Sequence, residues 1–124
     1  MAHEDNTFFT EEERNRKIRK ELRKLKKLIR DLSDDKKTLC QTLIENMAYT
    51  SVQLEELKEI IKRDGYFDKY QNGENQWGTK QSVASGLYLN VGKTYNMYLK
   101  QFREMLPEGV GGNDILQEFR EKYK

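Results

Sequence analysis

The sequence of 124 residues is poor in the residues from which most enzyme and metal sites are built. It has one histidine, His3, one cysteine, Cys40, and one proline, Pro107. A single cysteine rules out an intrachain disulfide and suits a reducing cytoplasm. With one histidine and no cysteine–histidine cluster, we expect no metal, no cofactor and no Ser–His–Asp triad. The scarcity of proline favours long, uninterrupted helices.

Long apolar runs are missing as well. No segment approaches the ~20 apolar residues of a membrane span, and residues 1–6 are polar and acidic, unlike a signal peptide. We therefore expect no membrane partner. Hydrophobic and charged residues each make up 35% of the chain, so one chain buries only a thin core. Either part of it is disordered, or its helices complete their core in an oligomer; the apolar stripes described below favour the oligomer.

A phosphate-binding loop is absent. Gly92-Lys93-Thr94 resembles the end of such a loop, but Leu87 stands where its first glycine belongs. Neighbouring carboxylates such as Glu55 and Glu56 are expected on a solvated helix surface rather than in catalysis. The sequence predicts a protein that is not an enzyme.

Positive charge is concentrated in one short segment. Residues 14–30 carry ten of the 23 Lys and Arg residues and one acidic residue, Glu21, for a net charge of +9. The other 107 residues have a net charge of −7. The segment also carries an apolar stripe at helical spacing: Ile18, Leu22, Leu25, Ile29 and Leu32. This pattern predicts a helix that packs by one face and presents cations on the remainder.

A solvent-exposed helix normally mixes charges of both signs, so this concentration of cations indicates an anionic partner. We predict that DNA phosphates are contacted by Arg14, Arg16, Lys17, Arg19, Lys20, Arg23, Lys24, Lys26, Lys27 and Arg30. Two alternatives remain open. The cations could pair with acidic helices of neighbouring subunits, or they could lie on a membrane surface. The stripe has no Trp or Phe anchor, which argues against the membrane.

Capping signals and apolar periodicity predict helices over residues 11–32, 35–63, 82–106 and 114–123. Residues 66–82, rich in Gly, Asn and aromatic residues, are predicted to form an ordered loop in which Trp77 and Tyr70 cover the open end of the helices. No strand pattern is found. The predicted fold class is all-α, with a long antiparallel helical pair, a basic N-terminal helix and a short C-terminal helix.

Four segments follow from this pattern: a flexible tail over residues 1–9, a basic DNA-contacting helix over 10–32, a helical-hairpin oligomerisation core over 33–108, and a tethered C-terminal helix over 109–124. Apolar and tyrosine side chains at heptad spacing are predicted to form the core of the helical pair or the subunit interface. They are Leu43, Met47, Leu54, Leu57, Ile61, Tyr88, Val91, Tyr95, Tyr98 and Phe102.

Several short stretches follow the basic segment in a distinctive order: LIENMAY at 43–49, LEELKEII at 54–61, YQNGENQ at 70–76, KTYNM at 93–97 and LP at 106–107. In this order the sequence resembles the small terminase subunits encoded by tailed phages and prophages of Gram-positive bacteria. The resemblance covers about residues 14–108, and its most distinctive stretches are NGENQ and KTYN.

The resemblance implies a DNA-packaging protein without a catalytic site of its own. Such a subunit forms a homo-oligomeric ring, here expected to hold about eight or more copies. It recognises double-stranded viral DNA in the cytoplasm of the infected bacterial host. It also recruits and regulates the large terminase subunit, which carries the ATPase and nuclease. The short C-terminal helix is the candidate contact for the large subunit or the portal.

One feature departs from the family. Many relatives begin with a helix-turn-helix, whereas the long helix predicted after residues 32–35 is not a compact recognition helix. The alternative function is a coiled-coil structural or scaffolding protein whose basic helix pairs with acidic helices of neighbouring subunits.

Overall fold

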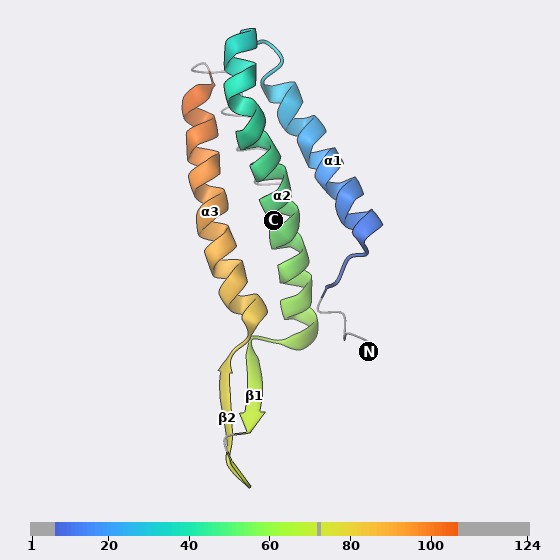
Figure 1. The fold of residues 1–124 in the computed structure, drawn as a ribbon, viewed down its shortest axis with the longest axis vertical. Helices are drawn as coiled ribbons and strands as arrows, with labels where there is room; N and C mark the ends of the chain where they lie inside the picture. The colour runs from blue at the N-terminus through green and yellow to red at the C-terminus, as the bar shows by residue number, and fades with distance from the viewer. Residues whose placement is uncertain (1–6, 72, 107–124) are drawn as a thin grey trace.

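Three long helices and one short antiparallel ribbon make up the part of the chain that the structure, a computed structural model, describes: residues 7–71 and 73–106. In chain order the elements are α1 (Glu11–Leu28), α2 (Asp34–Asp64), β1 (Phe67–Gln71), β2 (Trp77–Gln81) and α3 (Val83–Met105). α2 lies between α1 and α3, and the ribbon projects beyond the helices at the end where α2 finishes and α3 begins (Figure 1).

Each helix begins where a hydroxyl side chain accepts a hydrogen bond from a backbone N–H of the first turn. Thr10 accepts from Glu13 at 3.0 Å, Ser33 from Lys36 at 3.3 Å and Ser82 from Ser85 at 3.1 Å. These caps satisfy donors that a helix start leaves unpaired. The predicted starts of these three helices, at residues 11, 35 and 82, are therefore confirmed to within one residue. The first helix ends earlier than predicted, at Leu28, and residues 29–32 continue as turns.

The core lies at the end of the molecule where α1 turns into α2. There the stripe of the basic segment contributes Leu25, Ile29 and Leu32, which pack with side chains of α2 and α3: Cys40, Ile44, Met47, Ala48, Phe102 and Leu106. Ile44, Ala48, Cys40 and Phe102 have no exposed surface. Burial raises the pKa of the Cys40 thiol, against a smaller opposing effect of Lys36. The predicted apolar stripe of the basic segment thus faces the core of its own chain.

The predicted all-α fold class is wrong. Residues 67–81, predicted to contain no strand, form an antiparallel two-stranded ribbon in which Phe67 pairs with Gln81 and Gln71 with Trp77. The turn between the strands includes Gly73 with φ 121° and Asn75 with φ 63°, backbone angles that Gly and Asn adopt most readily. The structure thus has a turn between two strands in the segment where the sequence predicted an ordered loop.

The aromatic residues of the ribbon do not cover the helix ends as predicted. Trp77 is 68% exposed and Phe67 is 67% exposed. Tyr70 instead lies over Gly78, its partner on the opposite strand, where a Cβ atom would come within 2.7 Å of the ring. The ribbon is anchored to the helices at its base, where the Ser82 N–H donates to the Tyr66 carbonyl at 2.8 Å.

The predicted tail over residues 1–9 and the predicted helix over 114–123 lie largely or wholly outside the described residues. Among the helices of the described part, none has the length and apolar character needed to cross a membrane.

Candidate nucleic-acid interface

Six cationic side chains of α1 form one exposed surface, here called the outer basic face: Arg16, Arg19, Lys20, Arg23, Lys26 and Lys27. At ~100° per residue they occupy an arc of about 120°, and at ~1.5 Å per residue they extend over about 16 Å. Within residues 7–71 and 73–106, none of the six forms an ion pair. The face therefore presents unneutralised charge to solvent.

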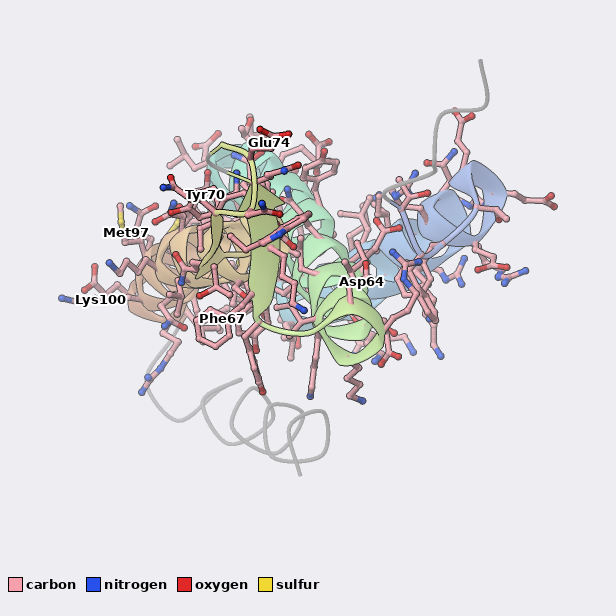
Figure 2. The ribbon with its side chains drawn as sticks, turned by 90° about the horizontal axis from the view of Figure 1, so that it is seen from below. Asp64, Phe67, Tyr70, Glu74, Met97 and Lys100 are labelled. Carbon is pink, nitrogen blue, oxygen red and sulfur yellow. The ribbon has the colours of Figure 1, made fainter. Side chains whose placement is uncertain are left out.

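This face points outward because the opposite side of α1 is fixed to the rest of the molecule. Leu25 and Ile29 are buried in the core, and Ile18 and Leu22 pack against it. Only one orientation of the helix about its axis buries such an apolar stripe. In that orientation the cations of the outer basic face point away from α2. α1 also stands to one side of the ribbon, α2 and α3, as the view along the molecule shows (Figure 2).

Two of the ten predicted contacts, Arg14 and Lys17, are directed toward α2. Arg14 donates from Nε to Glu56 Oε1 at 3.0 Å and from Nη2 to Oε2 at 2.8 Å. Lys17 Nζ lies 3.0 Å from Glu55 Oε1 and 4.8 Å above the centre of the Phe9 ring. These two cations already serve the contact between α1 and α2, so the structure separates them from the outer basic face.

The remaining two predicted contacts, Lys24 and Arg30, form weaker ion pairs. Lys24 Nζ lies 3.7 Å from Glu21 on the same helix, and Arg30 Nε lies 3.9 Å from Asp31. Arg30 and Asp31 are both strongly exposed, and exposed pairs of this kind contribute little. Both cations lie beside the outer basic face and take no part in the ion pairs that join α1 to α2.

Glu56 was predicted to lie on a solvated surface, and that prediction is wrong. Its residue exposure is 8%, and it accepts hydrogen bonds from the backbone N–H groups of Phe8 at 2.9 Å and Phe9 at 2.7 Å. Burial alone would raise the pKa of this carboxyl. The hydrogen bonds from Arg14, Phe9 and Phe8 outweigh that effect and hold the pKa below its ordinary value.

Phe9 completes this contact, which we call the Glu56 latch: Phe8, Phe9, Arg14 and Glu56. Phe9 is 7% exposed and packs edge-on against Phe8. Its carbonyl accepts from Arg14 Nη2 at 3.0 Å. The latch fixes the N-terminal end of α1 to α2, while Leu25 and Ile29 fix the other end. The outer basic face is thus held at both ends.

The predicted core and interface residues divide by burial. Met47, Leu54, Leu57 and Phe102 are buried within one chain. Six others are only half-buried: Leu43, Ile61, Tyr88, Val91, Tyr95 and Tyr98. Leu43, Tyr95 and Tyr98 pack against the core. Within residues 7–71 and 73–106, part of the apolar side of α3 therefore stays exposed.

Comparisons with protein families, with curated proteins and with solved structures found no match to this chain.

In chemical terms the arrangement can attract and hold a polyanion. No group of three or more His, Cys, Asp or Glu side chains able to hold a metal ion occurs in the described ranges, and residues 92–94 lie in the middle of α3 rather than in a loop. Sequence reasoning missed the latch, because Phe9 and Glu56 lie 47 residues apart along the chain.

Proposed function

We propose that the chain is a small terminase subunit of a tailed phage: a homo-oligomeric, DNA-binding component that recruits and regulates the large terminase subunit during genome packaging. The observation that carries the proposal is the outer basic face, six exposed cations on a helix fixed at both ends. The order of sequence stretches that resembles this family supports it independently.

Phosphate is the ligand that this face fits best. Arg and Lys neutralise phosphates without reading the bases, so the affinity is expected to depend steeply on salt and weakly on sequence. If all six cations meet phosphates, the slope of log K against log salt is about −5, which is about a thousandfold loss between ~50 mM and ~200 mM salt. A ring would place several such faces around one duplex and strengthen the binding through multivalency.

Charge reversal tests the proposal. The triple variant Arg19→Glu, Arg23→Glu, Lys26→Glu removes the middle of the outer basic face. We expect it to abolish retention of duplex DNA at ~50 mM salt, measured by fluorescence anisotropy. The matched control is Lys93→Glu, Lys100→Glu, Arg103→Glu, three exposed cations of α3 with the same total change in charge. Lys100 lies on the side of the molecule away from α1 (Figure 2).

The control should retain most of its affinity, because only long-range attraction changes, and this is screened within about 10 Å at 0.1 M salt. Equal losses in both triple variants would show that net charge, and not this face, attracts the DNA, and the proposal would fail.

A second function keeps one specific observation in its favour. Acidic residues of α2 do pair with cations of α1, since Glu55 holds Lys17 and Glu56 holds Arg14. A scaffolding protein could extend the same pairing between subunits. In that case the α1 triple variant would lower the native mass, and the wild-type protein would not bind duplex DNA even at low salt.

A further inference from the structure

The ribbon of β1 and β2 carries large aromatic side chains that no element of the described part of the chain covers. On one face lie Phe67, Lys69 and Gln71 of β1 with Trp77, Thr79 and Gln81 of β2, because the paired residues share a face. Phe67 and Trp77 are each about two-thirds exposed. An isolated two-stranded ribbon is marginally stable in water, and three or more strands are normally needed. The ribbon would therefore gain stability if a further strand paired with it.

The charges of the ribbon argue against nucleic acid as its partner. Over residues 67–81, Asp68 and Glu74 balance Lys69 and Lys80, so the formal net charge is zero. This contrasts with the outer basic face, where every charge is positive. A neutral surface rich in aromatic residues is typical of protein–protein contacts.

Among the described residues, no further strand pairs with the outer edge of β1 or of β2. The two edges differ in how well each could pair with the same edge of a second copy. Two copies of β1, related by a two-fold axis at its centre, would place Lys69 opposite the partner's Lys69. Two copies of β2 paired about Thr79 would place Thr79 opposite Thr79, Gly78 opposite Lys80 and Trp77 opposite Gln81. This register contains no pair of like charges and uses all five residues of the strand.

We propose that β2 pairs edge to edge, antiparallel, with β2 of a second copy of this chain, joining two ribbons into a four-stranded sheet. The contact is isologous, so it doubles any assembly that the helices form. The position of the ribbon favours this partner: it projects from the end of the molecule opposite the α1–α2 turn (Figure 1). In two copies joined at this end, most of each positively charged α1 helix lies far from the α1 helix of the other copy. The repulsion between the two outer basic faces is therefore small.

The chain offers an internal reporter for this contact, because Trp77 is its only tryptophan and lies in β2. Its fluorescence reports on the ribbon and not on contacts between helices. The interface is small, so the pairing is expected to be weak and dependent on concentration. In the full chain without DNA, the emission maximum should shift to shorter wavelength as the protein concentration rises from about 1 µM to about 1 mM.

Charge complementation tests the register. In the Thr79→Lys variant and in the Thr79→Glu variant, each chain would meet its own charge across the two-fold axis, and neither should show the shift. An equimolar mixture should regain it, because Lys then faces Glu. The matched controls are Gln71→Lys and Gln71→Glu, on the same face but on β1; each should shift like the wild type.

Three results would overturn the proposal: a Trp77 emission independent of concentration in the wild type, a normal shift in either Thr79 variant alone, or no recovery in the mixture. A response of Trp77 to added duplex DNA in place of a response to concentration would assign the ribbon to nucleic acid and also reject the self-pairing. Far-UV circular dichroism of each variant checks that the helices remain folded. The concentration series and the mixing experiment contain no DNA, so their outcome is independent of the proposed packaging function.

Discussion

The carboxylate of Glu56 carries four hydrogen bonds from one short piece of chain: two from the guanidinium of Arg14 and one each from the N–H groups of Phe8 and Phe9. Each of these bonds favours the ionised form. Because the pKa in the folded state lies below its ordinary value, the contribution of Glu56 to stability is complete above about pH 4.3, the ordinary pKa of Glu. It is lost as the pH falls through the lower, folded-state pKa.

The Glu56→Gln variant removes this charge while keeping the shape of the side chain. We expect it to lower the free energy of unfolding by about 2 kcal/mol at pH 7, and to weaken the dependence of stability on pH below about pH 4.3. Urea denaturation at fixed protein concentration measures both effects. Glu59→Gln is the control, since the Glu59–Lys62 pair at 3.3 Å is exposed at its Lys end and should contribute less than about 1 kcal/mol. An equal change in the two variants would contradict the role of the latch.

Two glycines provide opposite tests of packing. At Gly92 in α3, an added Cβ would lie 3.9 Å from Leu54 Cδ2, an ordinary contact. Gly92→Ala should therefore stabilise the fold by up to about 1 kcal/mol, the difference in helix propensity. At Gly78 the Cβ would meet the Tyr70 ring at 2.7 Å, so Gly78→Ala should displace Tyr70 and loosen the ribbon. Thermal denaturation measures the first effect, and hydrogen exchange of the ribbon amides the second; destabilisation by Gly92→Ala would mean that α2 and α3 pack more closely than described.

At the scale of the element, α1 carries two sets of cations with different tasks. Arg14 and Lys17 hold the helix to α2, and Arg16 and Lys20 face solvent on the same turns. We expect Arg14→Gln with Lys17→Gln to lower stability while the salt slope of DNA binding changes little. Arg16→Gln with Lys20→Gln removes the same charge, and should reduce that slope by about 2 and leave stability within about 0.5 kcal/mol. Salt titrations and urea denaturation distinguish the pairs; identical slopes for both would reject the division of α1 into two faces.

The helices could be predicted from the sequence because their signals are local. Thr10, Ser33 and Ser82 cap their own first turns, and Gly65, with φ 87°, follows the last residue of α2. The ribbon was missed for a physical reason. Strands are recognised by alternation of apolar and polar residues when one face is buried. Here both faces are largely exposed, so Phe67–Gln71 and Trp77–Gln81 show no such alternation.

The presence of a basic surface on α1 could be predicted from the sequence, but not which of the cations belong to it. Its charge density and the apolar stripe are sequence properties. Arg14 turns toward α2 because it binds Glu56, 42 residues further along the chain. Lys17 does so because it binds Glu55, 38 residues further along. Contacts over such separations leave no periodic signal. The same holds for the burial of Glu56, which follows from backbone donors in the segment before α1.

At the scale of the whole molecule, charge and apolar surface are segregated. Cations lie on the outward side of α1, whereas α3 keeps Tyr88, Val91 and Tyr98 half-buried and exposes Leu87 and Met97. The described part of the chain thus leaves apolar surface of α3 exposed, which supports the proposal that helices of several copies pack together. Repulsion between the basic faces would orient the copies so that α1 stays on the periphery or lines a path for DNA.

Native mass measured by light scattering tests this arrangement. We expect a defined assembly of about eight or more chains. Val91→Glu places a charge on the half-buried side of α3 and should reduce the assembly to small species with helicity retained. Phe102→Ala is the contrasting variant: Phe102 is fully buried within one chain, so it should cost about 3–5 kcal/mol of stability in every state of assembly. A wild-type protein that stays monomeric at all concentrations would remove the multivalency on which the packaging proposal depends, because one outer basic face by itself binds weakly near physiological salt.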